Sequence, residues 1–436
     1  MRNWVDYALA VSVSIIPFVI LIILLALYYN ATIFDYHMGF TGTEATLPSD
    51  FSDEVFYYAQ AKAFSAVGID SGYFTRNELT AQADYAHYYA WGLFPPMLYG
   101  FLGQLFGMHI YSIVLFNMGL LTCAILFAII VVQPNRTGMM CFGALIASYP
   151  TIIIFAPTSF LQILNLAFAI VLGVLVYHFL RDDRKPPSFI NLILVSVIVI
   201  LFSLIRVSWL FTLFPLFAYW GWQRKRIFGA ILLLAGASVL FIIVYLFVGQ
   251  TSSPYPTFLA DMLRHYPNFY RITVVGLRNV WANILAIHSL PLIHVVARYQ
   301  AFVIFGGCVY LMWRMWRNPN KPVISAPQQL PIHTFTLGTI LVLLISILTF
   351  EGLSFYRALS PQILFSLVLL WGFGMYRIVG TFVICHLIIF IPTLTQFQVI
   401  AEPHFVEQTE DIRAYMQAYE QMGVTYLADA NSERMV

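Results

Sequence analysis

The chain has 436 residues, of which 60% are hydrophobic and only 10% are charged, and its formal net charge is +2. Soluble domains carry about 25% charged residues, so this composition excludes a globular protein folded in water and predicts a bilayer environment. The near-neutral charge, with basic residues confined to short loops, argues against a nucleic-acid-binding surface.

Apolar runs recur along the chain, and each approaches the roughly 20 residues that a helix needs to cross a bilayer. The sequence therefore predicts an all-α polytopic membrane protein with about eleven transmembrane helices. Residues 1–396 would form the transmembrane domain and residues 397–436 a short tail. The predicted spans are residues 8–29, 110–132, 139–156, 158–180, 189–205, 207–221, 227–249, 299–316, 334–350, 360–376 and 378–396.

Basic residues predict the orientation of these helices, because Lys and Arg in short loops stay on the cytoplasmic side of a membrane. The short loops with Arg136, Arg181, Arg224 and Arg317 are all basic. Placing them inside puts the N-terminus in the cytoplasm, and it puts the loops at 30–109 and 250–298 and the C-terminal tail outside. We expect a multi-pass protein of the cytoplasmic (inner) membrane.

Two further stretches contain many apolar residues, but one is too short for a transmembrane helix and the other contains too many polar residues. Residues 92–107 contain Pro95 and Pro96 and would break the alternation of sides if they crossed, which predicts an interfacial or re-entrant helix. Residues 258–298 mix apolar and polar residues at helical spacing, which predicts helices lying on the outer surface.

The first external loop carries an adjacent acid pair, Asp53 and Glu54, at the start of a predicted helix that continues through Lys62. Neighbouring residues on a helix point in different directions, so one acid is expected to face a cleft and the other solvent. An alternative is that both acids only complement the helix dipole. His87 lies later in the same loop.

Arginines interrupt apolar sequence at two later points on the same predicted side. Arg206 breaks a long hydrophobic run, which indicates a site or a bound anion, or an arginine that snorkels at a helix end. Glu351, Tyr356 and Arg357 belong to a short external turn, where an arginine beside aromatic residues can bind a phosphate or pair locally with the acid.

An extracytoplasmic carboxylate near arginines suits a substrate that is both anionic and anchored in lipid. The carboxylate can deprotonate an acceptor hydroxyl, while arginine neutralises a departing phosphate. No phosphate-binding glycine loop and no metal-ligand spacing occur in the sequence. No cofactor is predicted, apart from a divalent cation that Asp53 could bind.

Three motifs resemble the GT-C superfamily of membrane glycosyltransferases, in the branch of protein O-mannosyltransferases, aminoarabinose transferases and lipopolysaccharide core transferases. They are the SDE-x-x-YY sequence at 52–58, the PP segment ending in LFG at 95–107, and YRALSPQILF at 356–365. The resemblance implies that Asp53 is a catalytic base or acceptor anchor supported by Glu54, and that Arg206 and Arg357 hold the donor phosphate. It departs at Gln162 and Asn165, where some relatives carry an acid.

These features predict an inverting glycosyltransferase that moves a sugar from a polyprenyl-phosphate donor, drawn from the membrane lipid, to an extracytoplasmic lipid, lipid-linked glycan or polysaccharide acceptor. Catalytic residues would be Asp53 and Glu54, and substrate-binding residues Lys62, His87, Arg206, Glu351, Tyr356 and Arg357. One alternative is a polysaccharide polymerase or ligase that uses undecaprenyl-diphosphate glycans, to which the arginines of 250–298 would contribute. The other is a transporter, in which Arg206 and Glu351 would line a pathway.

Overall fold

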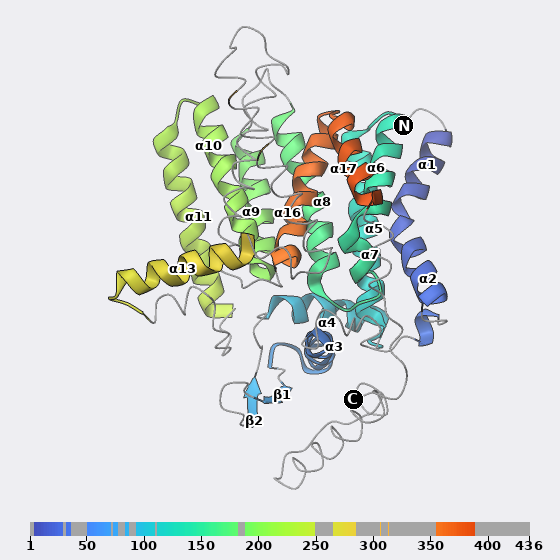
Figure 1. Ribbon diagram of the computed structural model, residues 1–436, viewed down its shortest axis with the longest axis horizontal. Helices are drawn as coiled ribbons and strands as arrows, with labels where there is room; N and C mark the ends of the chain where they lie inside the picture. The colour runs from blue at the N-terminus through green and yellow to red at the C-terminus, as the bar shows by residue number, and fades with distance from the viewer. Residues whose placement is uncertain are drawn as a thin grey trace.

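The computed structural model describes residues 4–28, 32–35, 50–70, 73–76, 83–86, 93–109, 111–181, 188–248, 265–284, 306, 313 and 355–388. This part of the chain is mostly helical, as the sequence predicts, and its long helices form a bundle (Figure 1). The bundle helices are α1 (Trp4–Ser14), α2 (Ile16–Tyr28), α5 (Ser112–Val132), α6 (Arg136–Ser148), α7 (Pro150–Phe155), α8 (Leu161–Leu180), α9 (Phe189–Ile205), α10 (Leu213–Gln223), α11 (Ile227–Val248), α16 (Phe355–Gly372) and α17 (Tyr376–Ile388). The remaining helices are α3 (Asp50–Val67), α4 (Phe94–Phe106), α13 (Phe269–Ile284) and the 3₁₀ turns η1 (Ile33–Asp35), η2 (Gly68–Asp70) and η3 (Val207–Thr212).

Two described helices, α5 and α8, are long and apolar enough to cross a membrane, and α1 with α2 makes a third if the pair is one span bent by 45°. Pro17 lies in the first turn after that bend and lacks the N–H that a continuous helix would use. Shorter apolar helices are Phe189–Ile205, Ile227–Leu240, Leu359–Gly372 and Tyr376–Ile388. The number of about eleven spans stays a prediction, since the run at 334–350 and most of that at 299–316 lie outside the described residues.

Three details differ from the sequence-based expectation. The run at 139–156 is divided into α6 and α7 at Tyr149, which is extended (φ −72°, ψ 113°) because Pro150 follows it. The run at 207–221 begins with the 3₁₀ turn η3. The loop at 30–109 includes a two-stranded antiparallel sheet, β1 (Tyr73–Arg76) with β2 (Ala83–Ala86), so the all-α expectation misses these strands.

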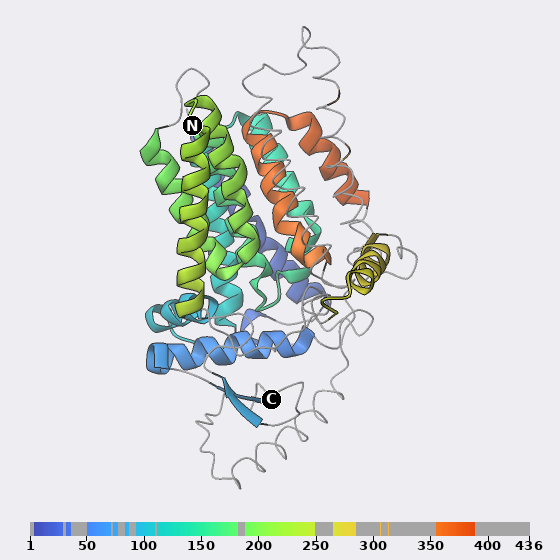
Figure 2. The same ribbon diagram turned by 90° about the vertical axis from the view of Figure 1, so that its left-hand side faces the viewer.

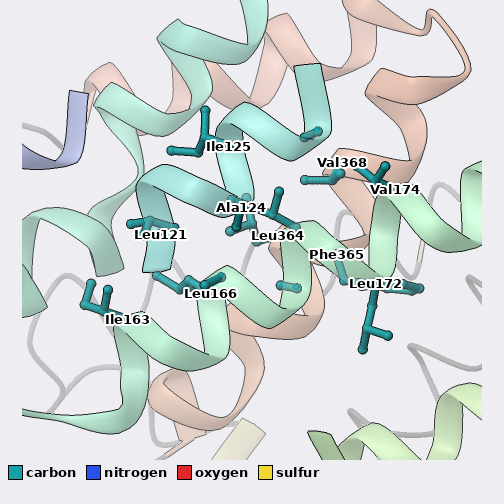
Figure 3. Close-up of a cluster of buried hydrophobic side chains, with 14 of the residues drawn as sticks. Leu121, Ala124, Ile125, Ile163, Leu166, Leu172, Val174, Leu364, Phe365 and Val368 are labelled. Carbon is teal, nitrogen blue, oxygen red and sulfur yellow. The ribbon is translucent and has the colours of Figure 1, made fainter. Parts of the chain in front are cut away.

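The core of the bundle lies where α8 packs between α5 and α16. Figure 3 shows apolar side chains of the three helices meeting in one cluster, including Leu121, Leu166 and Leu364. Gly173 lets α8 approach α16 closely, because a Cβ atom there would lie 2.9 Å from Cγ1 of Val368. These contacts hold α8 in the centre of the described bundle.

The two ends of the bundle differ in character. At one end, which we call the basic end, Arg136 forms an ion pair with Asp6 at 2.9 Å, and Arg181, Arg224 and Arg377 lie at helix termini (Figure 1). At the opposite end, the α3 end, α3 runs across the bundle axis (Figure 2). The described segments that the charge rule assigns to the cytoplasmic side thus share one end of the structure, while the loop with Arg317 lies outside the described residues.

Helix α4 starts at Phe94, with Pro95 and Pro96 in its first turn, where a missing backbone N–H costs no hydrogen bond. It lies at the α3 end and crosses α3 where a Cβ atom on Gly100 would stand 2.9 Å from the carbonyl oxygen of Ala61. The segment predicted as interfacial or re-entrant is therefore a helix of 13 residues packed against α3. Helix α13 lies on the outside of the bundle, crosswise to it (Figure 1).

Candidate functional site at the α3 end of the bundle

Three segments that carry predicted site residues lie at the same end of the bundle. The first turns of α3 carry Asp53 and Glu54, Arg206 joins α9 to η3, and the first turn of α16 carries Tyr356 and Arg357. Both views place the starts of α3 and α16 and the end of α9 at the α3 end (Figures 1 and 2).

The carboxylate near arginines that the sequence predicts requires Asp53, Arg206 and Arg357 to meet at the outer membrane interface, and this geometry does not test that contact. The side chains of Asp53 and Arg357 lie outside the described part of the structure, as do those of Glu54 and Tyr356. His87 and Glu351 lie outside the described residues altogether. The sidedness of the three segments is the described finding, and the contact between their charged groups stays a prediction.

Arg206 lies between α9 and η3, where the α-helix is interrupted, and not within a continuous helix. Its extended conformation (φ −146°, ψ 106°) ends α9, and its N–H donates to the carbonyl oxygen of Phe202 at 2.9 Å. Its own carbonyl oxygen accepts a hydrogen bond from the N–H of Trp209 at 3.0 Å. The side chain is half-buried. A charge at a helix end costs less in a bilayer than one at the middle of a span, and it can reach a lipid phosphate.

The segment after Arg206 is fixed to the central helix by buried polar groups. The Nε1 atom of Trp209 donates to Oδ1 of Asn165 at 3.3 Å, and Nδ2 of Asn165 donates to the carbonyl oxygen of Leu161 at 2.8 Å. Nε2 of Gln362, on α16, donates to Oγ of Ser208 at 3.5 Å. Polar side chains of α8 and α16 therefore bond to η3, the segment directly after Arg206.

A second polar contact ties α4 to the bundle. The hydroxyl of Tyr99 donates to Oδ1 of Asn117 at 2.6 Å, and Nδ2 of Asn117 donates to the carbonyl oxygen of Phe160 at 3.0 Å. Both side chains are fully buried. Burial raises the pKa of the Tyr99 hydroxyl well above its ordinary value, so this group stays a neutral donor at physiological pH.

A third polar group lies between α7 and α16. The hydroxyl of Tyr149 donates to the carbonyl oxygen of Ser360 at 2.6 Å, and Thr151 forms a short hydrogen bond with the Ser360 hydroxyl. Ser360 lies four residues after Tyr356. These bonds fix the second turn of α16 and thereby the position of the helix start that carries Arg357.

Helix α3 covers this end with one buried face. Tyr57, Tyr58, Gln60 and Ala61 are buried, and the Tyr57 ring packs edge-on against Phe160 with centroids 6.3 Å apart. Nζ of Lys62, a predicted substrate ligand, lies 6.0 Å from the centroid of the Tyr58 ring. This distance suits a weak cation–π contact, so Lys62 has a structural contact within α3 besides its predicted role in substrate binding.

In the residues that the structure describes, no group of three or more His, Cys, Asp or Glu side chains could hold a metal ion. A cation at Asp53 stays a prediction, because that side chain is not among those described. Comparisons with known proteins give no match to a protein-family model, a curated protein or a solved structure. The apolar helices are those expected of a membrane protein.

Several buried polar residues of this end were not predicted as site residues. They share one sequence signal, a polar side chain within or beside an apolar run, which also occurs for many structural residues. Only the packing distinguishes those that contact a second helix from those that bond within their own helix, such as Ser203. The unpredicted residues are Gln60, Tyr99, Asn117, Trp209 and Gln362.

Proposed function

We propose that the chain is an inverting glycosyltransferase of the GT-C type, which transfers a sugar from a polyprenyl-phosphate donor to an acceptor outside the cytoplasmic membrane. One observation carries the proposal: the helix with Asp53 and Glu54 lies across the same bundle end at which Arg206 and the first turn of α16 are found. An acid on the helix that lies across the bundle end, with arginines at the helix ends of the same side, suits a reaction at the lipid surface.

The arginines would bind the donor. A polyprenyl chain stays among the apolar helices while its phosphate reaches the membrane surface, where Arg206 is half-buried at the end of α9. Guanidinium groups bind phosphate oxygens in pairs of charge-assisted hydrogen bonds. Arg357 would complete the phosphate site from α16, with Tyr356, Glu351, His87 and Lys62 contacting the rest of the substrate.

Asp53 would act on the acceptor. It takes the proton of an acceptor hydroxyl, whose oxygen attacks the anomeric carbon of the sugar from the face opposite the phosphate. The bond between that carbon and the phosphate oxygen breaks, and its electron pair leaves with the polyprenyl phosphate. Attack from the opposite face inverts the anomeric configuration. The arginines stabilise the charge of the leaving phosphate, and Glu54 supports Asp53.

The test uses purified protein in proteoliposomes with radiolabelled sugar on undecaprenyl phosphate and a native membrane extract as the source of acceptors. Asp53→Asn should lower the transfer rate by a factor of about 10²–10⁴, the usual contribution of a general base. Arg206→Gln and Arg357→Gln should weaken use of the donor. Arg224→Gln, an exposed arginine at the basic end, is the matched control and should retain the wild-type rate.

Full activity in Asp53→Asn and in both arginine variants would overturn the assignment. A transporter would instead move its solute across the proteoliposome membrane without transferring label to an acceptor. A polymerase or ligase would use an undecaprenyl-diphosphate glycan in place of the monophosphate donor. Running the three substrates in parallel separates these classes.

A further inference from the structure

Gln60 is a buried amide that lacks partners. Its side chain is 2% exposed, and neither Nε2 nor Oε1 finds a hydrogen-bond partner in the structure. It belongs to the buried face of α3, with Tyr57, whose ring packs against Phe160, and Ala61, whose carbonyl oxygen lies close to Gly100 of α4. An amide buried among such groups without hydrogen bonds is costly, and such groups in native proteins are normally satisfied by a partner, water or a ligand.

The place of Gln60 connects it to the proposed reaction. It follows Asp53 by seven residues, about two turns of an α-helix, and residues at this spacing occupy the same side of a helix. The helix lies across the bundle end at which Arg206 is found. A ligand bound where this face of α3 meets α4 and the segment before α8 would therefore meet the amide.

The chemistry of the amide selects the kind of group that it would bind. A primary amide presents a donor and an acceptor side by side, which matches two adjacent hydroxyls, each of which can donate and accept. A phosphate offers only acceptors at its ionised oxygens, so Oε1 would oppose it. A neutral sugar ring fits Gln60, whereas the donor phosphate fits the arginines.

We propose that Gln60 binds adjacent hydroxyls of the transferred sugar and so contributes to sugar specificity. This inference rests on the proposed glycosyltransferase function. Gln60 takes no part in bond making or breaking. It would hold the sugar beneath α3 while the arginines hold the phosphate, and its own unsatisfied groups would gain their hydrogen bonds only when the sugar is bound.

The test is Gln60→Met, which keeps the length of the side chain and removes the amide. Thermal stability is measured in detergent micelles with no ligand, with undecaprenyl phosphate, and with undecaprenyl phosphate carrying mannose or glucose. The control is Gln104→Met, because Gln104 is an exposed glutamine of α4 whose Nε2 already donates to the carbonyl oxygen of Ser65 at 3.2 Å. Transfer of label to membrane acceptors is measured for the same proteins.

We expect Gln60→Met to be at least as stable as the wild type without ligand, since no formed hydrogen bond is lost. The extra stabilisation that the sugar adds over undecaprenyl phosphate should disappear, and kcat/KM should fall about 10- to 100-fold. Gln104→Met should keep the stabilisation by the sugar and the wild-type kcat/KM. Loss of ligand-free stability, or unchanged sugar stabilisation and transfer in Gln60→Met, would overturn the inference. Absence of transfer by the wild type would instead overturn the proposed function.

Discussion

The indole Nε1 of Trp209 donates a hydrogen bond to Oδ1 of Asn165 at 3.3 Å, and both side chains are buried. Trp209 follows Arg206 by three residues, and its backbone N–H also bonds to the carbonyl oxygen of Arg206. Asn165 belongs to α8, the helix at the centre of the described bundle. The pair therefore anchors the turn that carries Arg206 to the central, buried helix of the described bundle.

Asn165→Leu should lower the free energy of unfolding by about 1–3 kcal/mol, because it leaves the indole N–H of Trp209 buried without an acceptor. Denaturation in detergent micelles measures the change. Ser196→Ala is the control, because the Ser196 hydroxyl bonds only to the carbonyl oxygen of Leu192 in its own helix. Equal stability of the two variants would show that the contact between Trp209 and Asn165 contributes nothing to the fold.

Gly173→Ala should destabilise the protein by about 1–3 kcal/mol through overpacking of α8 against α16. The added Cβ would lie 2.9 Å from Cγ1 of Val368 and 3.2 Å from the carbonyl oxygen of Phe365, and the branched Val368 side chain has little freedom to move aside. The measurement is the midpoint of thermal unfolding.

Gly119→Ala provides the control for this substitution, because a Cβ atom at Gly119 in α5 would meet nothing within 4 Å. Alanine favours a helix over glycine, so Gly119→Ala should be neutral or stabilising. Combining Gly173→Ala with Val368→Ala should recover part of the loss. If Gly173→Ala unfolds at the wild-type temperature, the close approach of the two helices is wrong.

Tyr99 should make stability fall at alkaline pH. Its pKa is raised by burial, so the folded state holds the proton more tightly than the unfolded state, whose value is 10.0. The contribution of a raised pKa is fully present below the unfolded value and is lost as pH increases above it. Between about pH 10 and pH 11 the wild type should thus lose its advantage over Tyr99→Phe, whereas below that range the advantage should be constant.

At neutral pH, Tyr99→Phe should be less stable by about 1 kcal/mol or somewhat more, because Oδ1 of Asn117 loses its donor. The quantity to measure is the difference in unfolding midpoint between the two proteins at each pH, since other residues titrate in both. A difference that stays constant up to the alkaline limit would contradict the assignment of this pH dependence to Tyr99.

The basic end should face the cytoplasm. In a chain whose four cysteines are replaced by serine, Arg224→Cys marks the basic end and Ile69→Cys marks the α3 end, and both positions are exposed. A membrane-impermeant maleimide added to intact cells should label position 69 and not position 224, because arginines in short loops are retained inside. Labelling of position 224 alone would reverse the orientation and place Arg206 on the cytoplasmic side.

The sequence by itself determined that the chain is mostly helical and suited to a bilayer. The reason is local: a run such as 112–132 is apolar over the length of a span and satisfies its backbone hydrogen bonds within its own helix, so length and hydropathy suffice to predict α5. Proline placed the start of α4 within a few residues, whereas the break before Pro150 inside the run at 139–156 was not predicted. The basic loops likewise predicted which helix ends lie together.

Only the tertiary structure decided which polar residues meet. Asn117 and Asn165 look alike in the sequence, each one polar residue within an apolar run, yet one bonds to Tyr99 of α4 and the other to Trp209 of η3. Such partners are 18 and 44 residues away along the chain, and no local periodicity carries that information. Gln60 is the clearest case: helical spacing predicts its face, but only packing shows that its amide is buried with both of its polar atoms unsatisfied.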